Sequence, residues 1–390
     1  RHRSRSVLST SLIASATFVI VAVAAGQRNP AVETPDFDSG NGGFSLVAEA
    51  TAPILDSLQT PEGRVKLDIS PETDSADARL LNDMQAYSFR VRPGENASCL
   101  NLYQTTLPTI LGVPDELLER GGFRFVDQRK ADYWKLLTTP QDDGRIPVLG
   151  DMNTLMFSLH KSPGASIPLP DSATELVVSG MLDGSVLQGV LLMSDSNFRK
   201  LFPKQTGFRY FLIGANEQRI ANSGHFTHEE VNRLATLLEG SLTPYGFDAE
   251  RVSDRIAAFL IVQNTYLSTF QSLGGLGLLL GTLGLATVML RNVVERRSEL
   301  ALLRAVGFRS ANLSVMVLAE NAMLLVWGLA SGTVCALLAM LPHLMSTGAD
   351  TPWSNGGVLL LTVFGVGMLS SLFAVREASR TPIVSALRGE

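Results

Sequence analysis

The chain has 390 residues, of which 45% are hydrophobic, and its 32 basic and 37 acidic side chains give a formal net charge of −5. This acidic balance argues against a nucleic-acid partner, because proteins that bind nucleic acids carry a strongly basic surface.

Four long runs without a charged residue divide the chain. They are Val7–Ala25, Leu267–Leu290, Asn321–Pro342 and Ser354–Val375, with 19, 24, 22 and 22 residues. The hydrocarbon core of a bilayer needs about 20 apolar residues in a helix, so each run is long enough to cross a membrane. The small residues at the end of the first run resemble a signal-peptide cleavage site, but the three further runs favour a retained anchor.

The distribution of arginine predicts the orientation. Three arginines precede the first run, five lie in Arg291–Asn312 and three follow the last run, whereas His343–Trp353 has no basic residue. Short arginine-rich segments stay on the cytoplasmic side, so both termini are expected in the cytoplasm. We therefore expect a membrane protein with four transmembrane α-helices and a large extracytoplasmic mixed α/β domain inserted between the first and second spans.

The outer segment, residues 26–266, is acidic. It holds 21 of the basic and 31 of the acidic residues, so its formal charge is −10 and that of the rest is +5. A segment of this length can bury a complete core and has room for two lobes. Cys99 lies in it and Cys335 lies in the third run. The two cysteines are thus not expected to pair, and the core must hold the domain alone.

Strand and helix signals are mixed in the outer segment. Strands are expected at Phe44–Ala50, Ala86–Val91, Phe123–Val126, Glu175–Leu182, Ser185–Met193 and Gly207–Ile213. Asp183-Gly184 predicts a hairpin between its two flanking strands, because a type I′ turn needs positive φ at both positions. The glycine-rich Ser39–Gly43 is expected to be a flexible loop before the first strand.

Capping residues mark the expected helices. Ser194 precedes a short helix at Asp195–Phe202. Thr227 and Glu230 form a capping box for a helix to about Glu239, where Gly240 can end it. Ala249–Phe270 contains no Pro or Gly, so we expect a helix that continues into the second span as a stalk and transmits displacement.

Small residues four positions apart let the backbones of membrane helices approach closely. Three such pairs occur, Ser11/Ser15, Gly277/Gly281 and Gly328/Gly332, and we expect them to pack within the chain rather than to form a dimer face. Glu320, at the start of the third run, is a membrane-boundary carboxylate. Such groups are usually paired or face water, and we expect a contact with Arg304 or Arg309 rather than a proton relay.

The segment between the second and third spans is expected to couple the membrane part to a soluble partner. Arg291–Gly307 reads RNVVERRSELALLRAVG. It resembles the cytoplasmic segment of FtsX-like ABC permeases, which typically reads E-R-R-x-E-I/L-A/G-L-L-R-A-L/V-G. The residues that we assign to ATPase coupling are Glu295, Arg296, Arg297, Glu299, Leu300, Leu303, Arg304, Val306 and Gly307.

Other stretches resemble the same family. Thr381–Glu390 resembles its C-terminal ending, with Thr381 in place of the usual Asp, and Glu320 falls where the family often has a Glu. Ile146–Asp151 and Ser179–Leu182 resemble the outer domain of the MacB and lipoprotein-release branch.

The resemblance implies a location in the bacterial cytoplasmic (inner) membrane and several partners. These are a cytosolic ABC ATPase, a second permease unit (a homodimer partner or the other half of a longer chain), and an extracytoplasmic adaptor or lipoprotein. The expected divisions of the chain are a flank with the first helix (1–26), the outer domain (27–251), the stalk with the second helix (252–290), the coupling segment (291–312), the third and fourth helices (313–375) and a tail (376–390). Because the chain opens with Arg directly before a span, it reads as a fragment, such as the second half of a duplicated permease.

No site for nucleotide, metal or catalysis is expected in this chain. None of its lysines follows a glycine, so the phosphate-binding Gly-x-x-x-x-Gly-Lys-Ser/Thr loop is missing, and ATP and magnesium are expected on a partner ATPase. His225 and His228 lack the spacing of a zinc-protease helix and are expected to be plain surface residues.

Two functions fit these features. The one we expect is a permease that couples ATP hydrolysis by a partner to movement of the outer domain, for export or release of a lipoprotein or other amphiphile. The alternative is a signalling protein that controls an extracytoplasmic enzyme such as a cell-wall hydrolase. A sensor receptor would require a cytoplasmic output domain, for which this sequence has no candidate segment.

Overall fold

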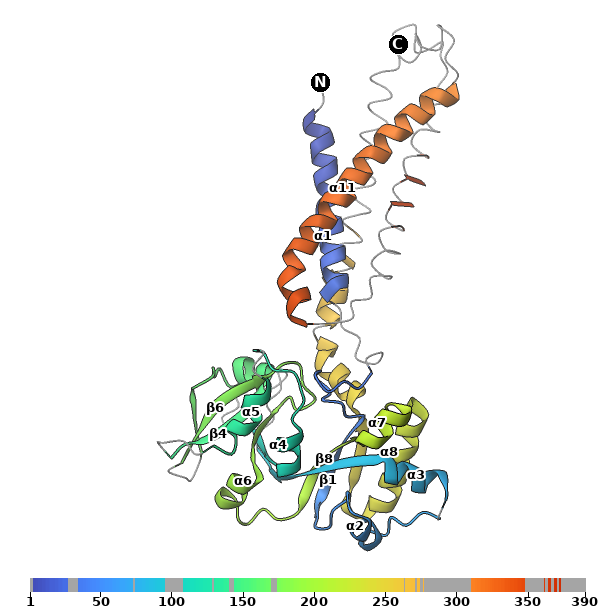
Figure 1. Ribbon diagram of the computed structural model, residues 1–390. Coiled ribbons are helices and arrows are strands. Elements are labelled where there is room, and N and C mark those ends of the chain that lie inside the picture. Colours follow the sequence, from blue (N-terminus) through green and yellow to red (C-terminus); the bar gives the residue numbers. More distant parts are fainter. Residues whose placement is uncertain are drawn as a thin grey trace. The chain divides into compact units, whose positions relative to one another are not determined.

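The computed structural model describes most of the chain (Figure 1). The described residues are 3–26, 34–72, 74–94, 108–127, 130–139, 144–169, 174–262, 264–270, 272–273, 276, 310–347 and a few positions between 361 and 372. They divide into two compact units, a sheet unit (29–259) and a helical unit (1–28 and 260–390). Each unit is described by itself.

Two long helices lie side by side in the helical unit, α1 (Arg3–Gly26) and α11 (Ser310–Thr347). Among the described residues, Ala322–Leu341 is one helical stretch long and apolar enough to cross a membrane, and Ile13–Ala22 is apolar over a shorter length. These stretches overlap the first and third expected spans. The expected second and fourth spans lie largely outside the described residues, so the structure does not test four spans.

The sheet unit is built on one nine-stranded sheet, in the order β5-β6-β4-β7-β3-β2-β8-β1-β9. Its strands are β1 (Leu46–Ile54), β2 (Met84–Arg92), β3 (Thr109–Val113), β4 (Ile146–Asp151), β5 (Ser166–Pro168), β6 (Glu175–Leu182), β7 (Val190–Ser194), β8 (Phe208–Ala215) and β9 (Phe247–Arg251). Both parallel and antiparallel pairs occur: β3 pairs β7 and β4 pairs β6 in parallel, while the other ladders are antiparallel.

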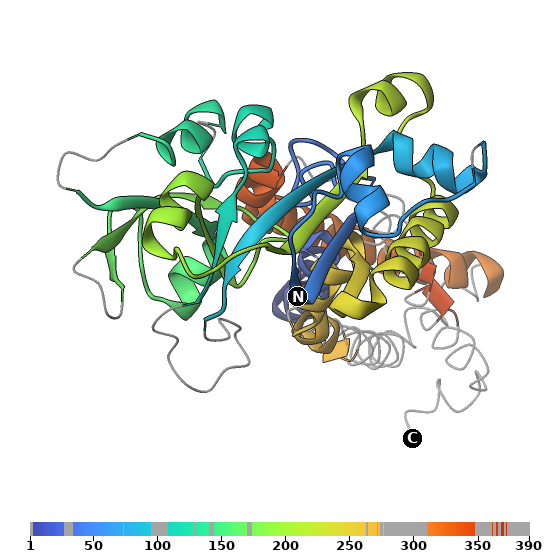
Figure 2. The same ribbon diagram turned by 90° about the horizontal axis from the view of Figure 1, so that it is seen from below.

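The sheet divides into two lobes, which Figure 2 shows side by side. The first lobe has a core from β1, β8, β9, the first part of β2 and the helices that cover them. The second lobe has a core from β3 to β7 and α6. Strand β2 belongs to both, because Met84–Phe89 pair with β8 and Arg90–Arg92 pair with β3. Within the sheet, the two lobes are therefore connected by the ladder of three residue pairs between β2 and β3.

Short helices connect the strands. They are α2 (Pro61–Lys66), α3 (Ala76–Asp83), α4 (Asp115–Arg120), α5 (Lys130–Leu136), η2 (Asn153–Ser158), α6 (Asp195–Leu201), α7 (Glu217–Ser223), α8 (His228–Leu242) and η3 (Thr243–Tyr245). Two expected caps are confirmed: the Ser194 side chain accepts from the Asn197 N–H, and Thr227 forms a full capping box with Glu230. Helix α8 buries Val231, Leu234, Leu238 and Leu242 on one face, as its 3.6-residue period requires.

The expected hairpin at Asp183-Gly184 is wrong. Gly184 does take a positive φ of 58°, but β4 lies between β6 and β7 and pairs with both. After the turn, the Ser185 N–H donates to Oδ2 of Asp151 and the Val186 N–H donates to the Gly40 carbonyl. The backbone N–H groups after the turn therefore donate to residues far away in the sequence instead of pairing across a hairpin.

Three smaller expectations also differ from the structure. The expected strand Phe123–Val126 is a single bridge between Phe125 and Leu182. Helix α8 continues past Gly240 to Leu242, because tertiary packing offsets the roughly 1 kcal/mol helix penalty of a glycine. The stalk helix begins at residue 252, since residues 249–251 belong to β9.

Candidate functional site

The residues that we assigned to ATPase coupling lie outside the described residues. This holds for every position from Glu295 to Gly307 and for Gly277 and Gly281. Glu320 lies in α11, just before the apolar stretch Ala322–Leu341. The described candidate positions are therefore the α1–α11 contact in the helical unit and the places where the sheet unit connects to its neighbouring segments.

The two helices α1 and α11 approach closely at two glycines. A Cβ atom added to Gly332 would lie 2.4 Å from the carbonyl oxygen of Ala14, and one added to Gly328 would lie 2.8 Å from Cγ2 of Ile13. These contacts place the Gly328/Gly332 pair at a helix interface within the chain. Ser11 and Ser15, by contrast, are exposed in the structure.

The two connections of the sheet unit meet at Ser45. The Ser45 N–H donates to the carbonyl of Ile213 on β8 at 2.9 Å, and its carbonyl accepts from the N–H of Val252 at 3.1 Å. Ser45 follows the segment that leads in from α1, and Val252 is the first residue of the helix at 252–262. The incoming and departing chains are therefore joined by a backbone hydrogen bond at one side of the sheet.

The departing helix is held to the sheet by packing. Val252 and Ile256 lie one turn apart and are 1% and 4% exposed. Full burial of an aliphatic side chain of this size stabilises by about 1.5–3 kcal/mol. Together the two side chains make the first turns of this helix a part of the core rather than a loose extension.

Ion pairs add to this attachment. Arg255 binds Glu49 on β1, with Nη1 2.9 Å from Oε1, and also pairs with Glu250 on β9. Burial alone would lower the pKa of Arg255, but the carboxylates of Glu49 and Glu250 raise it above its ordinary value. The buried phenol of Tyr210 on β8 lies near these charges, and burial raises its pKa. Arg255 thus connects the helix to the two strands beneath it.

The attachment continues at Arg251, the last residue of β9. Its Nε lies 2.8 Å from Oδ2 of Asp254, one turn further along the helix. Its Nη1 lies 3.4 Å from Nδ1 of His228 at the start of α8. The residues that join the departing helix to the sheet are named together as the stalk root. They are Ser45, Glu49, Glu250, Val252, Arg255 and Ile256.

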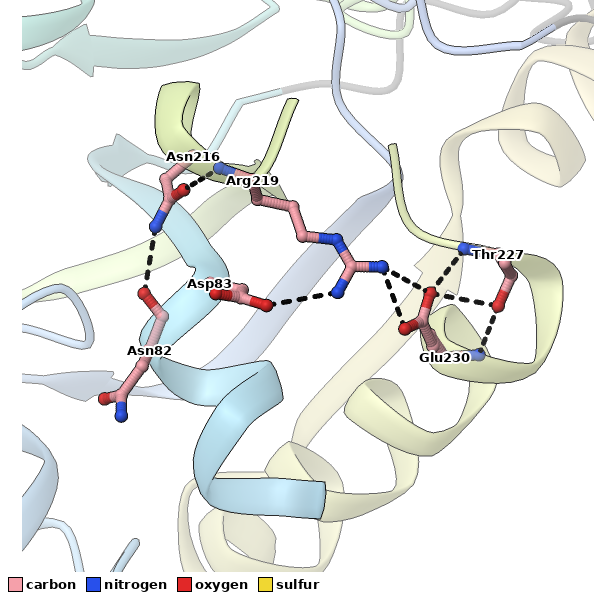
Figure 3. Close-up of polar contacts among 6 residues, drawn as sticks. All are labelled: Asn82, Asp83, Asn216, Arg219, Thr227 and Glu230. Atoms are coloured by element: carbon pink, nitrogen blue, oxygen red, sulfur yellow. Dashed lines mark hydrogen bonds and ion pairs between the residues drawn. The ribbon is translucent and has the colours of Figure 1, made fainter. Parts of the chain in front are cut away.

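A second polar cluster holds α7 and α8 to the end of α3 (Figure 3). Arg219 donates to Oδ2 of Asp83 at 3.1 Å and to both oxygens of Glu230 at 2.8 Å. Glu230 also accepts from the Thr227 N–H, and Asn216 Nδ2 donates to the Asn82 carbonyl. Every one of these contacts lies inside the first lobe, so we interpret the cluster as structural.

His225 and His228 show no metal-binding arrangement. Within the part of the chain that the structure describes, no three His, Cys, Asp or Glu side chains are grouped closely enough to hold a metal ion. Burial lowers the pKa of His225, and His228 faces Arg251.

The sequence points to a class of membrane transport proteins. Residues 272–383 match the model of the FtsX-like permease C-terminal family. Residues 272–383 therefore resemble the C-terminal domain of FtsX-like permeases, and the chain is similar to ABC transporter permeases. This bears out the resemblance that the coupling segment indicated.

Three curated proteins are similar to the chain. The pyoverdine export ATP-binding/permease protein PvdT of Pseudomonas savastanoi is 23% identical over 100% of this chain and 58% of its own length. The ABC transporter permease MJ1507 of Methanocaldococcus jannaschii is 25% identical over 36% of this chain and 37% of its own length. MacB, the macrolide export ATP-binding/permease protein of Bdellovibrio bacteriovorus, is 27% identical over 37% of this chain and 22% of its own length.

The matches thus span less than two thirds of these relatives. Among solved structures, the periplasmic region of MacB from Actinobacillus actinomycetemcomitans aligns over 56% of this chain and 92% of its own, with 12% identity and a TM-score of 0.29. At that score the likeness is too weak to define the fold.

Sequence reasoning missed the stalk root. Glu49 and Arg255 are separated by 206 positions, and no local motif connects them. The single local signal was the stretch without Pro or Gly after residue 249, which indicated the helix but not the residues that hold it.

Proposed function

We propose that ATP hydrolysis on a partner ATPase moves the sheet unit of this permease on the outer side of the bacterial cytoplasmic membrane. The observation that carries the proposal is the stalk root. There the helix that leads toward the second apolar run is fixed to β1 and β9 by the Val252–Ser45 hydrogen bond and the Arg255 ion pairs. A displacement of that helix therefore acts directly on the sheet.

The proposed topology has four spans and both termini in the cytoplasm. It is supported by the four uncharged runs and by the arginines that flank them, following the tendency of basic segments to stay inside. In this topology residues 26–266 lie outside, and the coupling segment Arg291–Gly307 lies at the cytoplasmic face.

The proposed ATPase contact uses one face of the coupling segment. In a helix, Leu300, Leu303 and Val306 recur at three-residue spacing and share a face. Such a face can insert into an apolar groove on a partner. Arg296 and Arg297 would then set its orientation by facing acidic residues around the groove.

The proposed cargo is an amphiphilic molecule such as a lipoprotein, exported or released on the outer side. The names of two similar proteins, a pyoverdine exporter and a macrolide exporter, support transport as the role of the assembled machine. A second permease unit and an outer adaptor or lipoprotein complete the proposed partners. We propose no catalytic step, cofactor or metal in this chain, with ATP and magnesium bound by the ATPase.

Leu303→Asp in the full-length protein tests the ATPase contact. We expect normal membrane insertion, because the position lies outside the apolar runs, but loss of ATPase co-purification and of transport-linked ATP hydrolysis. The matched control replaces Arg296 and Arg297 together by Gln, which should change the assembled complex less and the topology more. Wild-type partner binding and ATP hydrolysis in Leu303→Asp would refute the proposal. A partner that is a wall hydrolase rather than a transported molecule would favour the signalling alternative.

A further inference from the structure

The segment that leads into β1 is built into both lobes of the sheet unit. The carbonyls of Phe37, Ser39 and Gly40 accept hydrogen bonds from the N–H groups of Phe123, Arg124 and Val186, at 2.8, 3.2 and 3.0 Å. All three donors belong to connections of the second lobe. The same segment then continues through Ser45 into β1 of the first lobe.

The segment fits closely against its surroundings, and the expectation of a flexible loop at Ser39–Gly43 is wrong. A Cβ atom on Gly40 would lie 2.1 Å from the carbonyl oxygen of Gly184, and one on Gly42, at a φ of +60°, would lie 2.6 Å from the ring of Phe123. The Asn41 side chain closes the turn, since its Oδ1 accepts from the N–H groups of Asp36 and Gly43. Side chains larger than hydrogen are therefore excluded at two of its glycines.

Arg120 of α4 holds the segment from the second lobe. Its Nη2 donates to the Gly42 carbonyl at 3.0 Å, and its guanidinium carbon lies 4.9 Å from the ring centre of Phe37 and 4.5 Å from that of Phe44. Phe44 in turn packs edge-on against Tyr87 of β2, with ring centres 5.6 Å apart. A desolvated cation over an aromatic ring contributes up to about 2 kcal/mol, so this contact is a substantial one.

Other connections between the lobes are small. They include the three-residue ladder between β2 and β3 and the side chain of Arg90. Its guanidinium carbon lies 4.9 Å from the ring centre of Phe208 on β8, and its Nε lies 3.0 Å from Oδ1 of Asp195 on α6. A single strand shared by two lobes of one sheet can twist, so contacts away from β2 are needed to fix the angle between the lobes. The lead-in segment supplies such contacts at the point where the chain arrives from α1.

We propose that residues 36–44, held by Arg120, form a latch that sets the angle between the two lobes and transmits to it the movement of the first membrane helix. This inference rests on the proposed function. It adds a second route for movement besides the stalk root. Movement of the stalk root displaces the edge of the first lobe, whereas movement of the latch changes the angle between the two lobes.

The test measures the distance between the lobes in the full-length protein with its ATPase. Spin labels are placed at the exposed positions Ser162 and Asn232, one in each lobe, after Cys99 and Cys335 have been replaced. Arg120→Met keeps the apolar bulk of the side chain but removes its charge and hydrogen bond. Gly40→Ala perturbs the latch from the other side, and Arg79→Met, at an exposed arginine, is the control.

Without nucleotide, we expect a longer and broader distance distribution in Arg120→Met and Gly40→Ala than in the wild type and in Arg79→Met. With a trapped ATP state, we expect the distance change of the wild type to be reduced in both latch variants. A distribution in Arg120→Met and Gly40→Ala equal to that of the control would overturn the latch. A distance change on ATP trapping that is as large in both latch variants as in the wild type would also overturn the latch. A wild type that does not respond to nucleotide, combined with broadened latch variants, would instead contradict the proposed function and leave the latch as the contact that sets the lobe angle.

Discussion

The backbone N–H of Val252 donates a 3.1 Å hydrogen bond to the carbonyl oxygen of Ser45. This contact joins the end of the lead-in segment to the start of the stalk helix, so the two chain connections of the sheet unit lie next to each other. Because β9 ends at Arg251 and the helix begins at Val252, no linker separates the helix from the sheet.

Replacing Arg255 should weaken the stalk root. Arg255→Met removes the ion pairs with Glu49 and Glu250, whose side chains are 54% and 41% exposed. Because solvent screens pairs with such exposed partners, we expect a loss of only about 1 kcal/mol and a fall in melting temperature of about 2–4 °C. The coupling of ATP hydrolysis to transport should fall by more than this stability loss explains. Lys66→Met, at a pair exposed by 67% and 36%, is the control and should be neutral in both assays.

The helical unit offers a matched pair of glycine substitutions. Gly332→Ala should destabilise the α1–α11 contact, since the new Cβ would lie 2.4 Å from a backbone oxygen of Ala14, and overpacking of this kind costs about 1–3 kcal/mol. Gly365→Ala should be neutral or slightly stabilising, because no atom of the residues that the structure describes lies within 4 Å of its Cβ position. Thermal unfolding in detergent or nanodiscs measures both. Equal stability of the two variants would contradict the close approach of the helices.

Acid unfolding of the sheet unit should depend on Glu230. Burial alone would raise the pKa of Glu230, but hydrogen bonds from Thr227 and Arg219 outweigh it and lower the pKa. A carboxylate with a lowered folded pKa contributes stability that is present above its unfolded pKa, about 4.3, and is lost as pH falls through the folded pKa. Glu230→Gln should therefore reduce stability at pH 7 by about 1–2 kcal/mol and flatten the acid side of the stability curve. The exposed Glu229→Gln should retain the wild-type curve, and a steep acid limb that survives in Glu230→Gln would count against the Arg219 cluster.

A soluble fragment of the sheet unit should be more stable with both ends of the junction present than without them. Residues 34–259 contain the latch and the first turns of the stalk helix, and we expect one cooperative melting transition in reducing buffer. Residues 46–251 lack Ser45, the latch and the buried Val252 and Ile256. We expect that shorter fragment to melt at a lower temperature. Equal melting temperatures would show that the junction adds nothing to the stability of the domain.

Local signals could be predicted from the sequence, and long-range pairings could not. The caps at Ser194 and Thr227 depend on residues three positions away, so the sequence alone was enough to find them. The hairpin at Asp183-Gly184 failed because β4, from an earlier part of the chain, lies between its two expected strands. The resemblance of the coupling segment was found because its motif is continuous.

The junction itself had no signal in the sequence. Ser45 and Val252 become neighbours only because β1 pairs with β9 at the edge of the sheet, and residues 249–251 of β9 were expected to be helical. Residues 39–43 looked flexible because they are rich in glycine, whereas the glycines are present because Gly184 and Phe123 leave no room for a side chain. Glycine in such a place marks close packing, and composition alone does not separate that use from flexibility.

Energy transfer from a fluorophore on the sheet unit to acceptor lipids tests the central claim most directly. The donor is placed at Asn232, an exposed position on α8, in nanodiscs that contain the full-length protein and its ATPase. We predict that trapping the ATP-bound state changes the transfer efficiency in the wild type and that Leu303→Asp abolishes the change. An unchanged efficiency in a wild-type complex that hydrolyses ATP, or a change that persists in Leu303→Asp, would contradict the account.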